Sequence, residues 1–133
     1  MRMRRKIPSR RERGSAAVEF ALVLPLLLVV ALALLQLGLL VRDSLMVQAA
    51  ARAGARAAAV LDDSVAVREA SLAAGPGLDP GSVTVDVVRT GARGEPVTVS
   101  IRYASTERVP LVAWLFPEAV TMVASVAARQ EFG

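Results

Sequence analysis

The sequence predicts an α+β protein: a long N-terminal transmembrane α-helix continues into an Ala-rich helix and packs on a small antiparallel β-sheet of about three strands. Three observations predict this class. Residues 20–41 carry no formal charge, residues 42–61 are rich in alanine and lack proline, and the last third of the chain alternates apolar and polar residues. The chain is 54% hydrophobic with a mean hydropathy of +0.49, which suits a membrane-anchored protein better than a soluble one.

Residues 1–14 form a basic leader. Seven of them are Arg or Lys and one is Glu. Beside a membrane span, such positive charge marks the cytoplasmic side. We therefore expect a single-pass protein of the bacterial cell membrane with a cytoplasmic N-terminus and an extracytoplasmic C-terminal domain. No nucleic-acid partner is expected, because the leader has no aromatic residue on which a base could stack.

Residues 15–61 are expected to form one transmembrane and extended helix. The uncharged stretch at 20–41 has 22 residues. At about 1.5 Å per residue it reaches roughly 33 Å, enough to cross a bilayer core of about 30 Å. Gln36 is its one strongly polar residue, and Pro25 lies in its first turns. The alternative is a cleavable secretory signal, whose apolar region of about 7–15 residues is normally shorter.

The Ala-rich part of this helix carries a face of small residues. Ala50, Gly54 and Ala58 recur every four residues, a spacing that lets helix backbones approach closely. This face packs either against the chain's own small domain or against copies and relatives of the chain. The sequence supports the two interpretations equally.

Residues 62–133 are expected to form a small extracytoplasmic α+β domain. Asp62-Asp63-Ser64 predicts the N-cap of a helix over 65–74. Alternation predicts strands at 82–89 and 96–103, joined by a loose hairpin, and a third strand at 121–130. Two adjacent carboxylates fall far short of a calcium loop, so no metal site is expected at Asp62 and Asp63.

An apolar segment bracketed by prolines, residues 109–117, lies between the second and third predicted strands. One interpretation is a short helix or turn that closes the core over the sheet. The other is an exposed patch that touches the bilayer or a neighbouring subunit. Trp114 suits either role, because its ring is large and its N–H needs a polar partner.

The composition argues against an enzyme. The chain has no histidine and no cysteine, which excludes a Cys nucleophile, a Ser-His-Asp triad and a disulfide. No convergent cluster of carboxylates suggests catalysis. We expect no catalytic residue, no metal and no cofactor.

The junction between leader and span carries a specific pattern. Residues 13–25 read Arg-Gly-Ser-Ala-Ala-Val-Glu-Phe-Ala-Leu-Val-Leu-Pro, with Glu19 five residues after Gly14. This pattern resembles the processing site of type IV prepilins. Together with the Ala-rich helix and the short β-rich end, the chain resembles TadE-like proteins, which are minor pilins or pseudopilins of the tight-adherence (Flp) pilus system. The related TadF-like and TadG-like proteins stay open.

The resemblance implies a mechanism. A prepilin peptidase would cut after Gly14, so the mature chain would begin at Ser15. Glu19 would then meet the N-terminal amine of an adjacent subunit. These two groups are both charged near neutral pH, and each is less costly in a low-dielectric bundle when paired.

The resemblance also implies partners and a role. The partners would be the prepilin peptidase, other Tad/Flp pilins and pseudopilins, the inner-membrane pilus assembly platform and the lipid bilayer. The chain is too long for the major Flp pilin, which points to a minor or initiating subunit in surface adhesion or secretion. The alternative is a single-pass, membrane-anchored extracytoplasmic binding module that never enters a pilus.

Overall fold

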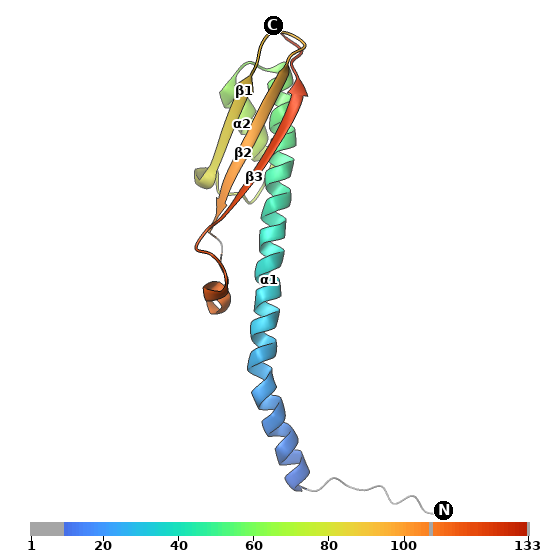
Figure 1. Ribbon diagram of the computed structural model, residues 1–133, viewed down its shortest axis with the longest axis vertical. Helices are drawn as coiled ribbons and strands as arrows, with labels where there is room; N and C mark the ends of the chain where they lie inside the picture. The colour runs from blue at the N-terminus through green and yellow to red at the C-terminus, as the bar shows by residue number, and fades with distance from the viewer. Residues whose placement is uncertain (1–9, 107, 133) are drawn as a thin grey trace, which may run out of the picture.

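The computed structural model describes residues 10–106 and 108–132, with side chains of the first helix described from Gly14 onward. Most of the basic leader, residues 1–9, lies outside the described residues. The elements are α1 (Arg10–Val60), α2 (Ser64–Ala74), the 3-10 helix η1 (Pro80–Ser82), β1 (Val83–Arg89), β2 (Pro96–Ser105), the 3-10 helix η2 (Pro110–Leu115) and β3 (Val120–Arg129). The predicted α+β class is confirmed (Figure 1).

Helix α1 dominates the molecule. Its 51 residues correspond to about 77 Å at 1.5 Å per residue. Leu and Ala, both strong helix formers, make up about half of it. Pro25 lies inside the helix without ending it. The described part of the helix begins at Arg10, so the junction at Gly14 is helical.

The strands form one antiparallel sheet in the order β1-β2-β3. Val87 lies opposite Val99, and Ile101 lies opposite Ala124. All three predicted strands are present, with ends that differ by one or two residues; β2 runs on to Ser105. The β1–β2 hairpin turns at Gly94, whose φ of +91° is a conformation that favours glycine.

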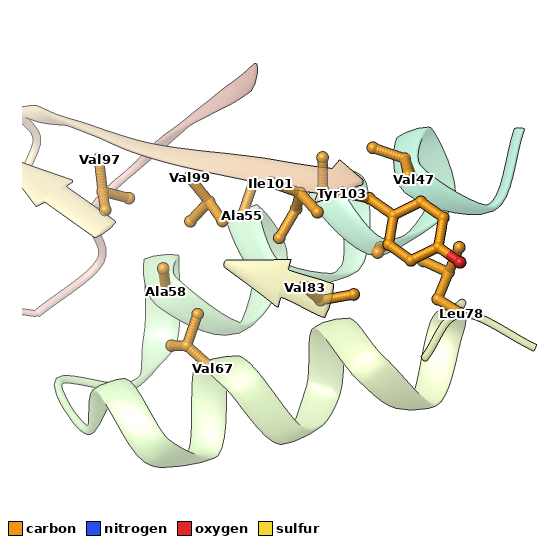
Figure 2. Packing of buried hydrophobic residues seen from close by; sticks show 12 residues of the cluster. Val47, Ala55, Ala58, Val67, Leu78, Val83, Val97, Val99, Ile101 and Tyr103 are labelled. Atoms are coloured by element: carbon orange, nitrogen blue, oxygen red, sulfur yellow. The ribbon is translucent and has the colours of Figure 1, made fainter. Parts of the chain in front are cut away.

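The core lies between the inner face of the sheet and the two helices (Figure 2). Alternate residues of β2 point inward and are buried, namely Val97, Val99, Ile101 and Tyr103. They meet alanines of α1, and α2 contributes Val67. Because alanine is small, the helix backbone can approach the sheet closely.

Helix α2 begins as the sequence predicts. The carboxylate of Asp63 accepts a hydrogen bond from the backbone N–H of Val65 at 2.8 Å, which satisfies one of the helix's first donors. Its neighbour Asp62 instead forms an ion pair with Arg89, with 3.3 Å between Asp62 Oδ1 and Arg89 Nε.

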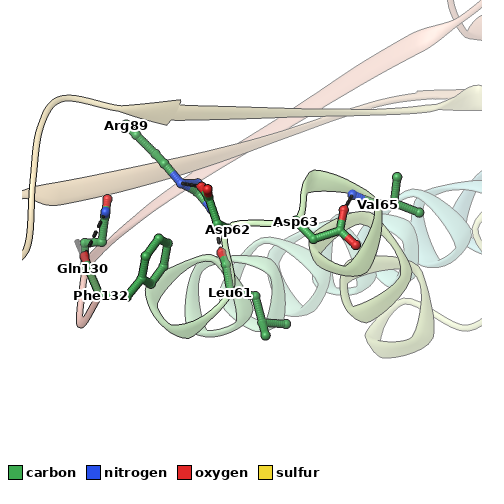
Figure 3. Close-up of polar contacts among 7 residues, drawn as sticks. All are labelled: Leu61, Asp62, Asp63, Val65, Arg89, Gln130 and Phe132. Carbon is green, nitrogen blue, oxygen red and sulfur yellow. Dashed lines mark hydrogen bonds and ion pairs between the residues drawn. The ribbon is translucent and has the colours of Figure 1, made fainter.

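Arg89 ties the end of the sheet to the end of α1 (Figure 3). Its Nη2 donates to the carbonyl of Leu61 at 2.6 Å. Its guanidinium also lies over the ring of Phe132, 5.6 Å from the centroid. The segment that follows β3 is also bonded to α1, since the N–H of Glu131 donates to the carbonyl of Ala59 at 2.8 Å. We call this set of contacts the Arg89 latch.

The apolar segment at 109–117 does not close the core over the sheet. It forms η2, which lies beyond the end of the sheet beside the middle of α1 (Figure 1). Val112 is fully buried, whereas the side chains of Leu111, Trp114 and Leu115 are exposed. We call residues 109–117 the apolar turn.

Candidate processing and assembly site

Gly14 and Ser15 lie on an exposed turn near the start of α1. Among the described residues, no atom comes within 4 Å of the position that a Cβ on Gly14 would occupy. Packing against the described residues therefore does not require glycine here, and φ at this position is helical. Glycine weakens a helix by roughly 0.5–1 kcal/mol relative to alanine, so this turn opens more easily than its neighbours.

Glu19 stands one turn after Ser15 on the same exposed part of α1. The hydroxyl of Ser15 donates to Glu19 Oε1 at 3.2 Å. Among residues with described side chains, the ion pairs are Arg42–Asp43 and Arg89–Asp62, and neither involves Glu19. The carboxylate is thus accessible to a group from outside the chain.

The helix beyond Glu19 offers a bare apolar surface. Every residue from position 20 to position 28 is exposed, and these residues are almost all Leu, Val, Ala or Phe. Within the described residues, α1 contains one stretch, within Gly14–Val60, that is long and apolar enough to cross a membrane. Such a surface is stable against lipid or against other apolar helices.

Two polar residues of α1 are buried where the domain begins to cover the helix. Gln36 is 2% exposed, and its Oε1 accepts a hydrogen bond from the backbone N–H of Val109 at 2.7 Å. Asp43, seven residues on, accepts a hydrogen bond from Ser105 Oγ at 2.8 Å. Sequence reasoning assigned neither residue to a site, because their partners are far away in the chain.

The small-residue face occupies the middle of the intramolecular interface. Ala50, Gly54 and Ala58 are all buried. A Cβ on Gly54 would collide with Ser71 Oγ of α2 and come within 3.0 Å of Val99 Cγ1 of β2. In this structure, α2 and the sheet of the same chain pack closely against these small residues.

The predicted site residues therefore form two separate groups on one helix. Gly14, Ser15 and Glu19 lie together at its bare N-terminal end, whereas the small-residue face lies under the sheet near its C-terminal end (Figure 1). Within the described residues, no three His, Cys, Asp or Glu side chains gather closely enough to hold a metal ion.

Fold and site together define a class of protein: one long apolar helix able to anchor in a membrane, with a small α+β domain packed on its C-terminal half. The family model described as TadE-like protein matches residues 14–56. The predicted resemblance to TadE-like proteins is confirmed over this segment, which begins at Gly14 and ends in the Ala-rich part of α1. No curated protein and no solved structure matches the chain.

Proposed function

We propose that the chain is a prepilin-like subunit of the tight-adherence (Flp) pilus system, cut after Gly14 by a prepilin peptidase. The observation that carries the proposal is the exposed Gly14–Ser15–Glu19 turn at the head of a bare apolar helix. The TadE-like match starts at the same glycine. No contact within the described residues requires glycine there, which supports a role for Gly14 in recognition by another protein.

In the proposed mechanism, cleavage exposes a new amine on Ser15. The Ser15 hydroxyl already contacts Glu19 of the same chain, so the new amine begins close to a carboxylate. When helices gather during assembly, Glu19 pairs with the amine of the adjacent subunit. Inside an apolar bundle, a carboxylate without a partner is costly, and this cost sets the axial register between subunits.

We propose a structural or initiating role for the subunit, with no catalysis of its own. Its partners would be other Tad/Flp pilins and pseudopilins and the inner-membrane assembly platform. The folded domain supports a minor role, because the sheet and its loops project from one side of the helix and would widen any fibre built from this chain alone (Figure 1).

The test is the intact mass of the membrane-extracted chain after co-expression with its cognate peptidase. We expect the wild type to begin at Ser15 and Gly14→Arg to keep its leader. Ala17→Gly is the control for a change in local helix strength: it weakens the turn that Gly14→Arg strengthens, but it leaves Gly14 in place, so it should be cut at the same bond. A wild-type chain that keeps its leader beside an active peptidase would leave the membrane-anchored binding module as the function.

A further inference from the structure

We propose that the apolar turn is a second membrane contact, which inserts Leu111, Trp114 and Leu115 into the outer headgroup–acyl boundary of the bilayer that α1 crosses. The proposal rests on α1 spanning the membrane and is independent of processing at Gly14. The bare helix would hold the chain in the bilayer, and the turn would hold the domain against its surface.

The position of the turn along α1 is fixed by a hydrogen bond. The backbone N–H of Val109 donates to Gln36 Oε1 at 2.7 Å. Gln36 lies five residues before the end of the uncharged stretch at Val41, which is about 7.5 Å along the helix axis. Interfacial segments typically bury their apolar side about 5–10 Å into the headgroup–acyl boundary, so the turn lies at a matching depth.

The side chains of the turn suit this boundary. Trp114 is 75% exposed and Leu111 is 66% exposed, although both are large and apolar. The indole N–H of Trp114 donates to the carbonyl of Leu111 at 3.2 Å, so its polar atom has a partner without water. Tryptophan is enriched at membrane interfaces because its ring is apolar and its N–H is polar.

The turn is held rigidly enough to act as an anchor. Val112 is fully buried, and η2 contacts α1. Arg108 closes the segment by donating to the carbonyls of Phe116 at 3.3 Å and Pro117 at 2.9 Å. Arg108 is exposed, and an arginine can keep its charged end among lipid headgroups while its aliphatic stem lies along apolar surface.

The bilayer fits this surface better than a second copy of the chain. Leu35 and Leu37, the neighbours of Gln36 in α1, are themselves exposed, so at the level where Val109 bonds to Gln36 the helix also presents apolar side chains. Three side chains also fall far short of the roughly 800 Å² that each partner buries in a standard protein interface.

The experiment uses the intrinsic fluorescence of the full chain, because Trp114 is its single tryptophan. The protein is reconstituted into phosphatidylcholine bilayers that carry bromine at known depths of the acyl chain. We expect Trp114 to emit at short wavelength, to lose most of its emission to bromine near the headgroup end, and to resist iodide in the water. Iodide quenching without bromine quenching would overturn the proposal.

Two relocated tryptophans calibrate the measurement in the Trp114→Phe background. Leu28→Trp on the bare part of α1 should be quenched by deep bromine, and Val88→Trp should respond to iodide alone. Val88 is exposed beside Arg89, whose latch holds the far end of α1. If bromine quenches the tryptophan of Leu28→Trp while Trp114 of the wild type responds only to iodide, the membrane contact of the turn is overturned and the span is retained. Unquenched Leu28→Trp overturns the span and the contact together.

A contact between the apolar turn and a second copy of the chain would give a different fluorescence result. Shielding of Trp114 that depends on the protein-to-lipid ratio, without bromine quenching, would assign the turn to a protein interface and overturn the membrane contact. The mass measurement after peptidase treatment is unaffected by any of these results, so failure of the proposed function is separately visible.

Discussion

Glu19 has one described partner, the hydroxyl of Ser15 in the preceding turn. That contact is intramolecular and accessible to solvent, so it contributes little to folding. Any strong effect of replacing Glu19 should therefore arise outside the folded chain, in contact with another protein or with lipid. Residue-scale experiments can thus separate assembly from stability at this position.

Glu19→Gln should leave cleavage after Gly14 and the stability of the domain unchanged, because Glu19 touches neither the core nor the sheet. It should lower the yield of cross-linked subunits in membranes at least tenfold, corresponding to about 1.4 kcal/mol of lost association. The yield is measured by cross-linking the peptidase-treated chain through a position close to Ser15. Equal yields for wild type and Glu19→Gln would reject the pairing of Glu19 with a neighbouring amine.

Gly54 is the position where one added methyl group should matter most. Alanine improves an exposed helix by about 0.8–1 kcal/mol over glycine, but overpacking typically costs about 1–3 kcal/mol. Because a Cβ here meets Ser71 Oγ and Val99 Cγ1, we expect Gly54→Ala to lower the free energy of unfolding. Denaturant titration in detergent, followed by circular dichroism, gives the value.

Two companion variants make the Gly54 result specific. Gly38→Ala should leave stability unchanged or higher, since no described atom lies within 4 Å of the new methyl group. In a Ser71→Ala background, Gly54→Ala should cost less, because the colliding hydroxyl is gone. The same loss in both backgrounds would show that the collision is not the cause.

The limits of sequence reasoning are clear at Gln36 and Asp43. The sequence shows Gln36 as a polar residue in an apolar run, but its partner is the N–H of Val109, 73 residues away. Asp43 bonds to Ser105, 62 residues away. Neither partner is a motif or lies at a helical or strand spacing. Pairings of this kind are fixed by tertiary packing, so no local pattern reveals them.

At the scale of elements, the parts with a strong period were predictable. Inward residues of β2 recur every second position, and this alternation predicted the strand to within two residues at its end. The sequence predicted the small-residue face of α1 but not the surface that packs against it, because Ala50, Gly54 and Ala58 permit close approach to any apolar surface. The structure shows the sheet and α2 in that place.

The Arg89 latch joins the end of β1, the end of α1 and the segment after β3. These contacts are non-covalent, since the chain has no cysteine and therefore no disulfide. Arg89→Ala should lower the free energy of unfolding by about 1–3 kcal/mol, the range for hydrogen bonds to charged groups and their buried partners. Arg89→Lys should lose nearly as much. Asp62 is largely exposed, so the retained ion pair contributes little, and the hydrogen bond to Leu61 and the contact with Phe132 depend on a planar guanidinium.

Arg102→Ala is the matched control for the latch. Arg102 lies on the exposed face of β2, in the same sheet. Thermal unfolding of the three variants beside wild type gives the comparison. If Arg102→Ala and Arg89→Ala shift the midpoint equally, the effect belongs to charge on the sheet and not to the latch.

At the scale of the whole molecule, the domain and the C-terminal half of α1 share one core. The buried cluster combines Val47 and alanines of α1 with β2 and Val67 of α2. A chain of residues 34–133 should therefore fold, because it keeps the complete buried face of α1, including Gln36. Residues 62–133 alone should not fold, since the inner face of the sheet would lose its main cover.

The magnitude supports this expectation. Each fully buried Val or Ile contributes about 1.5–3 kcal/mol, and a domain has only about 5–15 kcal/mol in total. Exposing Val97, Val99 and Ile101 together removes a comparable amount. Amide dispersion in NMR spectra of the two fragments decides the matter. A dispersed spectrum from 62–133 would show that α1 is an accessory to the domain and not part of its core.

Pro25 divides α1 into two mechanical sections. Its ring cannot donate the backbone hydrogen bond to the preceding turn, so bending is easiest there. Contacts with the domain begin only beyond this point and brace the helix as far as the Arg89 latch. If a force acts on the N-terminal end, the braced part of α1 carries it to the sheet as a stiff rod, and the direction of the pull changes most easily at Pro25, within the apolar stretch of the helix.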